Sequence, residues 1–322
     1  MIRIVPPLPD RPQLSMRLIN YAAERPDSWD RLTDLARLLD LGGVDRLVVS
    51  DHVVFGEDLE AYARPETGGS AGIKQPTGPD GYWMEPLTVL AAVTSVTDRI
   101  RLGTYVILAA LRRPMVLAKV SATLDALSKG RFELGAGIGW QREEYETAGL
   151  EFERRGKLLD QTLAVCQTLW TEERASFDDG DLRFENIHNM PKPVHPGGVP
   201  VWLGGSASPR VADRIARFGC GWIPWGRDAR DLASGITRMG ELLEQRDGPS
   251  LGEIGIVGTV KLVTSDAGSL DVPATMASTG RLLEMGVTDV RCNALLPDDL
   301  SEAEDQIGEI VAAFRRETGT PG

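Results

Sequence analysis

Strand-like and helix-like patterns alternate along the whole chain, and this alternation restricts the fold more than any other feature. Eight short apolar segments bounded by turn residues predict strands, and helix-like segments alternate with them. The predicted strands cover about residues 2–5, 46–51, 100–107, 131–137, 200–203, 221–225, 254–263 and 290–295. Because no Pro/Ser-rich linker divides the series, we expect a single (β/α)8 TIM barrel, an α/β fold, over residues 1–322. The alternative is a doubly wound sheet, which normally needs fewer strands in one domain.

Two segments interrupt the alternation. A loop rich in Gly and Pro covers about residues 53–83, and residues 172–198 contain a predicted β-hairpin that turns at Asp179-Gly180. Loops vary more than the scaffold that carries them, and they often hold binding residues. We therefore expect these two insertions to build the substrate pocket.

The charge and cysteine content of the chain limit its partners. The formal net charge is −12, which disfavours nucleic acid and anionic membranes. No apolar run reaches the length of a membrane span, and the first residues lack the layout of a signal peptide. The three cysteines are far apart without metal-ligand spacing, so we expect buried thiols and no metal site. These features predict a cytoplasmic protein that acts on a small molecule.

Asp51-His52 stands at the end of the second predicted strand. In a TIM barrel the active site forms at the C-terminal ends of the strands, and an imidazole there can donate or accept a proton near neutral pH. The other two histidines, His188 and His195, lie in the hairpin insertion and its exit loop. His52 is therefore the candidate for proton transfer, and the alternative is a histidine that caps the strand by bonding to backbone.

Alternating glycines end the fourth predicted strand. Gly135, Gly137 and Gly139 precede Trp140 and a charged helix start. Missing side chains let another group approach the backbone, so we expect a ligand close to this strand. The spacing differs from GxGxxG, which makes a Rossmann dinucleotide loop a weak interpretation.

Gly204-Gly205-Ser206 links the fifth predicted strand to a helix that begins at Ser208-Pro209. Free N–H groups and the helix dipole at such a place suit a phosphate group. An ordinary strand-to-helix turn explains this motif equally well.

Trp140 and Trp225 each follow another strand, where an indole ring could pack on a flat ligand or simply line the rim.

Six segments between about residues 45 and 226 carry a family resemblance. They read SDHVV at 50–54, RIRLGTYVILAALRRPMVLAK at 99–119, LDALSKGRFELGAGIGWQREEYETAG at 124–149, FERRGKLLDQTLAVCQTLWT at 152–171, FENIHNMPKP at 184–193 and VPVWLGGSASPRVADRIARFGCGW at 199–222. In this order they resemble luciferase-like flavin and deazaflavin oxidoreductases. The most similar subgroup is the one expected to use the deazaflavin coenzyme F420.

The resemblance implies roles for individual residues. Asp51 and His52 match a pair beside the deazaflavin ring, with the histidine as proton donor or acceptor. Tyr105-Val106 matches a cis peptide bond behind the ring, and Ile138-Gly139 matches backbone near the cofactor. Gly204, Gly205 and Ser206 match the phosphate-binding turn. Trp225, and Trp140 with it, are assigned to the substrate pocket.

The reaction expected from the resemblance is hydride transfer between F420 and a small organic substrate, by a homodimer. One alternative is an FMN-dependent monooxygenase of the same family, and another is a barrel that binds a flavin without catalysis. Trp140 stands where sugar-phosphate dehydrogenases of the family have a second acid/base glutamate. That substrate class is therefore not expected.

Overall fold

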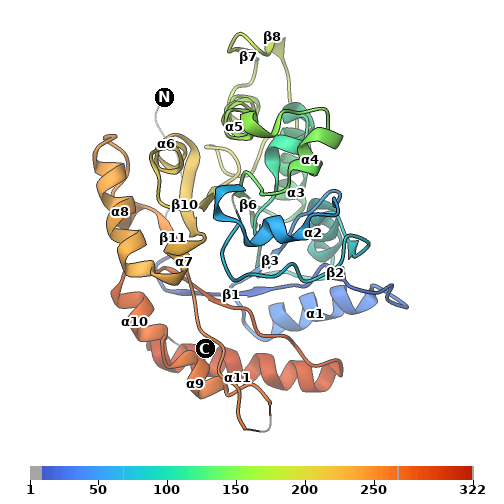
Figure 1. Ribbon diagram of the computed structural model, residues 1–322, viewed down its shortest axis with the longest axis vertical. Helices are drawn as coiled ribbons and strands as arrows, with labels where there is room; N and C mark the ends of the chain where they lie inside the picture. Colours follow the sequence, from blue (N-terminus) through green and yellow to red (C-terminus); the bar gives the residue numbers. More distant parts are fainter. Residues whose placement is uncertain (1–8, 68, 267, 321–322) are drawn as a thin grey trace.

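Eight parallel strands close into a barrel in the computed structural model, which describes residues 9–67, 69–266 and 268–320 (Figure 1). The order around the barrel is β1-β12-β11-β10-β9-β6-β5-β3, and each neighbouring pair is parallel. These strands are β1 (Gln13–Arg17), β3 (Arg46–Val49), β5 (Arg101–Thr104), β6 (Phe132–Ala136), β9 (Val201–Gly205), β10 (Gly219–Pro224), β11 (Gly255–Thr259) and β12 (Asp289–Cys292). The predicted (β/α)8 TIM barrel is confirmed.

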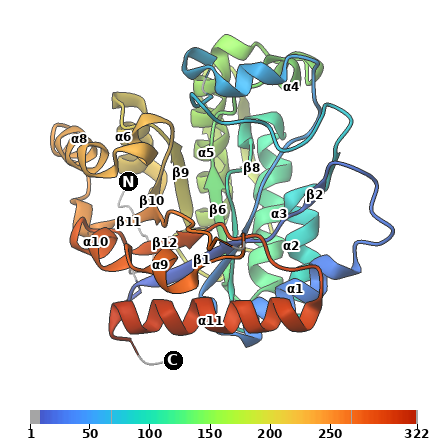
Figure 2. The same ribbon diagram turned by 60° about the horizontal axis from the view of Figure 1, so that its bottom comes forward.

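Helices form a layer around the outside of the barrel, and Figure 2 shows α11 running past α1 along one side. Contacts between α1 and α2, α2 and α3, α3 and α5, α5 and α6, and α6 and α8 continue this layer. The helices are α1 (Asp30–Leu41), α2 (Pro86–Thr94), α3 (Pro114–Leu127), α4 (Arg142–Thr147), α5 (Arg155–Thr171), α6 (Pro209–Phe218), α7 (Arg227–Arg230), α8 (Leu232–Glu244), α9 (Val272–Met276), α10 (Thr279–Glu284) and α11 (Leu300–Thr318). Within the described ranges, no helix is both long enough and apolar enough to cross a membrane.

Both predicted insertions are present. The first contains the short 3-10 helices η1 (Leu59–Ala63) and η2 (Pro65–Thr67), and it ends in β4 (Tyr82–Trp83), which pairs with β2 (Tyr21–Ala22). The second contains the predicted hairpin, formed by β7 (Ala175–Asp178) and β8 (Arg183–Ile187). The hairpin projects away from the barrel beyond α5, whereas the first insertion lies beside α4 (Figures 1 and 2).

The first barrel strand differs from the prediction. The strand expected at residues 2–5 lies outside the described residues, and the strand that closes the barrel between β3 and β12 is β1. Its sequence, QLSMR, alternates polar and apolar residues and so does not read as a buried strand. The polar residues are tolerated because the barrel interior is itself polar: Ser15 Oγ donates to the buried carboxylate of Asp289.

Charged side chains fill part of the barrel interior. Glu133 on β6 forms ion pairs with Arg101 and, at 2.5 Å, with Arg46. Arg46 also pairs with Asp289, and its guanidinium lies 4.3 Å from the centre of the Trp202 ring. Buried charges need such partners, because an unpaired charge in the interior is strongly destabilising.

Two segments that follow barrel strands each contain two helices, and one face of α3 is exposed. Residues 228–245 form α7 and α8, because the Asp231 side chain accepts a hydrogen bond from Ser234 N at 3.3 Å and caps a new helix. Residues 272–285 form α9 and α10. On α3, Val116, Val120 and Leu127 recur at helical spacing yet are exposed, whereas Leu124 is buried.

Candidate active site

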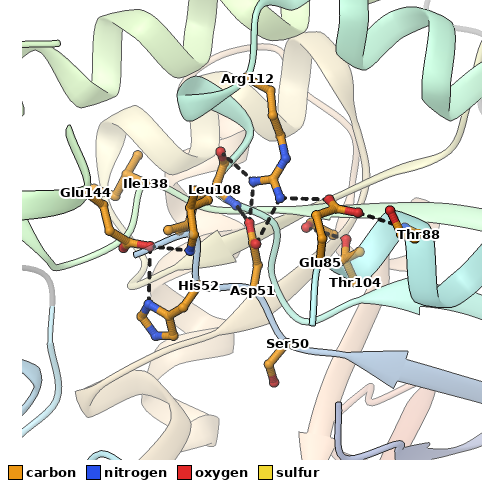
Figure 3. A network of polar contacts seen from close by, with 12 residues as sticks. Ser50, Asp51, His52, Glu85, Thr88, Thr104, Leu108, Arg112, Ile138 and Glu144 are labelled. Carbon is orange, nitrogen blue, oxygen red and sulfur yellow. Dashed lines mark hydrogen bonds and ion pairs between the residues drawn. The ribbon is translucent and has the colours of Figure 1, made fainter. Parts of the chain in front are cut away.

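Asp51 follows β3 at the C-terminal end of the barrel, and its carboxylate is fully engaged (Figure 3). Arg112 donates to both oxygens, at 2.5 and 2.9 Å, and Leu108 N donates to Oδ2 at 2.8 Å. Arg112 also donates to Glu85, whose other oxygen accepts from Thr88 N and caps α2. This geometry favours a positioning role for Asp51, while His52 stays the candidate for proton transfer.

Electrostatic interactions in this network favour the charged forms of Arg112 and Glu85. Burial acts to lower the pKa of Arg112, but the nearby carboxylates of Asp51 and Glu85 outweigh it and raise the pKa. Burial likewise acts against the ionised form of Glu85, while hydrogen bonds from Thr88 and Arg112 bring its pKa below the usual range. The ion pairs thus fix the β5–α3 connection to the end of β3.

His52 lies beside Asp51 but faces a different partner. Its Nδ1 is 3.4 Å from Glu144 Oε1, and the imidazole side chain is 10% exposed. Three aromatic rings surround the imidazole, with centroids 4.4 Å away for Phe55, 4.8 Å for Trp83 and 5.6 Å for Trp140. These rings restrict the imidazole to one orientation at the barrel mouth.

Trp140 and Trp225 are linked by a residue that the sequence did not single out. The Tyr62 ring, from η1, lies 5.1 Å from Trp140 and 6.1 Å from Trp225. Burial first, and then the neighbouring Tyr105, raises the pKa of Tyr62 to about 12, so the phenol stays protonated at neutral pH. The insertion was expected to build the pocket, but nothing in its sequence marked Tyr62 or Trp83 above its other residues.

The Tyr105-Val106 peptide bond is cis, as the family resemblance implied.

The close approach of Thr104 and Val106 explains why the neighbouring strand has glycines at its end. A Cβ at Gly135 would overlap the Thr104 carbonyl oxygen, whereas one at Gly137 would lie 2.5 Å from Val106 Cγ2. The bare backbone of these two glycines therefore accommodates the end of β5, and the approach of a ligand to this strand stays a prediction.

The Gly204-Gly205-Ser206 turn lies at the end of β9, and Gly205 has a φ of 150°. Ser206 Oγ donates to the Trp225 carbonyl oxygen at 3.0 Å. Ala207 N donates to the buried carboxylate of Asp228 at 2.7 Å, and Asp228 is paired with Arg238. A carboxylate of the protein itself thus already uses one of the N–H groups near the start of α6.

Several buried polar atoms near the strand ends have no hydrogen-bond partner among the described residues. They are Arg17 Nε at the end of β1, both amide atoms of Gln141 after β6, and Asn293 Oδ1 after β12. Buried polar atoms are nearly always paired, so orphaned ones indicate a missing partner. A bound molecule with carbonyl and N–H groups along a flat edge, such as a flavin or deazaflavin ring, fits this set of donors and acceptors.

The remaining titratable groups give no sign of a metal centre. Within the part of the chain that the structure describes, no group of three or more His, Cys, Asp or Glu side chains could hold a metal ion. Cys166, Cys220 and Cys292 are buried, as expected, and none of them forms a disulfide. Burial raises the thiol pKa of Cys166 and of Cys292.

The sequence of residues 13–267 matches the model of the luciferase-like monooxygenase family. The chain belongs to this family. An uncharacterized protein of Mycobacterium tuberculosis is 33% identical over 258 residues, which cover 79% of this chain and 84% of that protein. An F420-dependent glucose-6-phosphate dehydrogenase of Nocardia farcinica is 32% identical over 199 residues, which cover 60% of this chain and 52% of the dehydrogenase.

The fold is also similar to that of solved structures. A riboflavin lyase crystallised with modified FMN and riboflavin superimposes with a TM-score of 0.71, covering 97% of this chain and 93% of the lyase at 14% identity. At this identity the likeness concerns the fold alone. The chain is thus similar in sequence to an F420-dependent dehydrogenase, and similar in fold to a riboflavin lyase.

Proposed function

We propose that this protein is an oxidoreductase that transfers a hydride between coenzyme F420 and a small organic substrate. The observation that carries the proposal is the position of His52, an imidazole held in an aromatic enclosure at the barrel mouth. A histidine in such a place can take or supply the proton that accompanies hydride transfer. The similarity to an F420-dependent dehydrogenase supports the choice of cofactor.

The residues that would hold the cofactor lie at the ends of several strands. When bound, F420 supplies a ring carbon that donates or accepts a hydride. Tyr105-Val106 and Ile138-Gly139 would lie beside the ring, and Gly204, Gly205 and Ser206 would bind the phosphate. The unpartnered Gln141 amide and Asn293 Oδ1 would bond to polar groups of the cofactor. Asp51 would keep the β5–α3 connection in place through Arg112.

The substrate side of the site favours an uncharged, largely apolar molecule. Trp140, Trp225 and Tyr62 present aromatic rings to one another across the barrel mouth. Aromatic side chains provide large apolar surfaces for a flat or aliphatic group. Trp140 also stands in the place of the second acid/base glutamate expected in a sugar-phosphate dehydrogenase, which argues against a sugar phosphate.

Cofactor titration of the purified apoprotein tests the proposal. We expect a lower dissociation constant for F420 than for FMN, followed by fluorescence or absorbance of each ring. Turnover with a panel of small alcohols and ketones should proceed without oxygen, because a deazaflavin has carbon in place of the flavin nitrogen and reacts poorly with oxygen. Tighter binding of FMN together with oxygen-dependent product formation would instead establish the monooxygenase alternative, which the similarity to an FMN-containing structure favours. Binding without turnover across the panel would leave a non-catalytic flavin-binding barrel.

We also propose that the protein is a homodimer that associates through an apolar face next to α3. This face, the α3 patch, consists of Met115, Val116, Val120, Leu127, Met190 and Val194, whose exposed fractions range from 37% to 60%. The segment that carries Met190 and Val194 lies directly against α3. Lys119 Nζ donates to Met190 O, and Val194 N donates to Asp125 at 2.7 Å. Contiguous exposed apolar surface of this kind is typical of an interface.

Charged substitutions in the α3 patch should separate the dimer. The double variant Val116→Asp/Val120→Asp is expected to run as a monomer, because two carboxylates would lose their hydration in the interface. Light scattering after size-exclusion chromatography measures the mass. The variant Leu41→Asp is the control, since Leu41 is 66% exposed on α1 and lies outside the patch. The proposal would be contradicted if the double variant kept the mass of a dimer or if the wild type were a monomer.

We propose a cytoplasmic location as well. The three cysteines are buried and form no disulfide, which fits a reducing compartment, where thiols are not oxidised to disulfides. Fractionation of cells that produce the tagged protein would test this location.

A further inference from the structure

We propose that Glu144 is a positioning residue that holds neutral His52 in the tautomer with its proton on Nδ1. His52 Nε2 is then the nitrogen that exchanges a proton with the substrate. This inference rests on the proposed role of His52. It assigns a function to a residue of α4 that the sequence did not single out.

Glu144 is a buried carboxylate with few alternative partners. The residue is 2% exposed, and its Oε1 accepts a hydrogen bond from Val53 N at 2.8 Å. The same oxygen lies 3.4 Å from His52 Nδ1 (Figure 3). Its Oε2 is buried and has no hydrogen-bond partner among the described residues. Among the residues that the structure describes, the imidazole is thus the one basic side chain within ion-pair distance of the Glu144 carboxylate.

The helix that carries Glu144 is fixed to the end of β6. Tyr145 Oη donates to the Ile138 carbonyl oxygen at 2.6 Å, and Tyr145 is fully buried. The loop after His52 packs on the same helix, since a Cβ at Gly56 would meet the Glu143 side chain. Both contacts hold the Glu144 carboxylate opposite the imidazole.

The chemistry of the two groups selects one tautomer. An ionised carboxylate can only accept hydrogen bonds, whereas each ring nitrogen of a neutral imidazole is either a donor or an acceptor. A lone pair on Nδ1 would face the carboxylate oxygen and repel it, so Nδ1 has to carry the proton. The Phe55, Trp83 and Trp140 rings oppose rotation of the imidazole. The present 3.4 Å separation is long for a hydrogen bond, as is common for catalytic groups before a ligand binds.

Another histidine of the chain provides an internal reference of the opposite kind. Gly197 N donates to His195 Nδ1 at 3.1 Å, so neutral His195 has to carry its proton on Nε2. His188 is exposed on the hairpin insertion. Since the chain has only these three histidines, their signals can be assigned by replacing each one in turn.

The tautomers can be read directly by nuclear magnetic resonance. Protein labelled with ¹⁵N in histidine would be recorded in a two-bond ¹H–¹⁵N correlation experiment. A pH series up to about 9.5, roughly three units above the ordinary histidine pKa, reaches the neutral imidazoles. We expect His52 to show a protonated Nδ1 and an unprotonated Nε2, and His195 to show the reverse.

Two variants separate the effect of Glu144 from a general change in charge. Glu144→Gln keeps the size of the side chain and an acceptor for Val53 N, but it removes the negative charge. His52 should then shift toward the tautomer with the proton on Nε2. Glu146→Gln makes the same chemical change two residues away on the exposed side of α4, and it should leave His52 unchanged.

The wild-type spectrum alone can overturn the inference, even if Glu144→Gln does not fold. A neutral His52 with its proton on Nε2, or an identical His52 pattern in wild type and Glu144→Gln, would contradict it. The measurement uses the protein without cofactor or substrate. Its failure therefore leaves the cofactor titration intact, and a failed titration leaves this result intact.

Discussion

Replacing His52 with alanine is expected to lower turnover by roughly two to four orders of magnitude, the usual contribution of a general acid or base. The cofactor dissociation constant should change little, because the expected phosphate contacts and most of the expected ring contacts come from other strand ends. Steady-state rates and the cofactor titration, measured on the same preparation, would separate the two quantities.

The control for this experiment is His188→Ala, which removes an exposed histidine from the hairpin insertion. Its turnover should match that of the wild type. If His52→Ala also turns over at a near wild-type rate, His52 has no part in proton transfer. A large loss of cofactor affinity in His52→Ala would instead assign His52 to binding.

Replacing Gly135 with alanine is expected to destabilise the barrel by about 3 kcal/mol, the upper part of the range for overpacked cores. The new Cβ would overlap the Thr104 carbonyl oxygen and lie 3.3 Å from Ile223 Cδ1. A backbone carbonyl cannot move aside as a flexible side chain can. The Ile107 N–H, which donates to the Gly135 carbonyl at 2.7 Å, would also be displaced. Urea denaturation followed by circular dichroism measures the loss.

Gly308→Ala is the matched control for Gly135→Ala. Gly308 lies within α11, where a Cβ would meet nothing within 4 Å. Alanine favours a helix over glycine by roughly 0.5–1 kcal/mol, so this variant should be as stable as the wild type or slightly more stable. Equal stability of the two variants would show that Gly135 is not required by the packing of β5 on β6.

The local sequence was sufficient to predict the architecture. Alternating strand and helix periodicity predicted the barrel, and the structure places strands at seven of the eight predicted positions. The two insertions and the Asp179-Gly180 turn were also predicted, because the preference for a loop or turn depends on a few consecutive residues. The rule that strand ends meet at one side of a barrel placed Asp51-His52 and Gly204-Gly205-Ser206 at the same mouth.

The first strand shows where local patterns fail. Gln13 and Ser15 of β1 are buried, so hydrophobicity alone could not identify the strand. Ser15 is satisfied inside the barrel because Asp289 and Arg291 of β12 form hydrogen bonds with its hydroxyl group. Such partners become neighbours only once the barrel has closed.

One part of the candidate site could be predicted from the sequence, and the other part depended on the tertiary structure. The sequence alone determined the fold class and the strand end that carries His52, since both follow from short-range periodicity and from chain order. Only the tertiary structure decided which groups surround that histidine: Glu144 bonds to the backbone of Val53 from 91 residues away, and Tyr62 reaches Trp140 from a long loop. The same holds for Asp51, whose carboxylate accepts hydrogen bonds from Arg112, 61 residues further along the chain. Contacts between residues far apart in the chain depend on how the closed barrel brings its strand ends together, and no local pattern records that geometry.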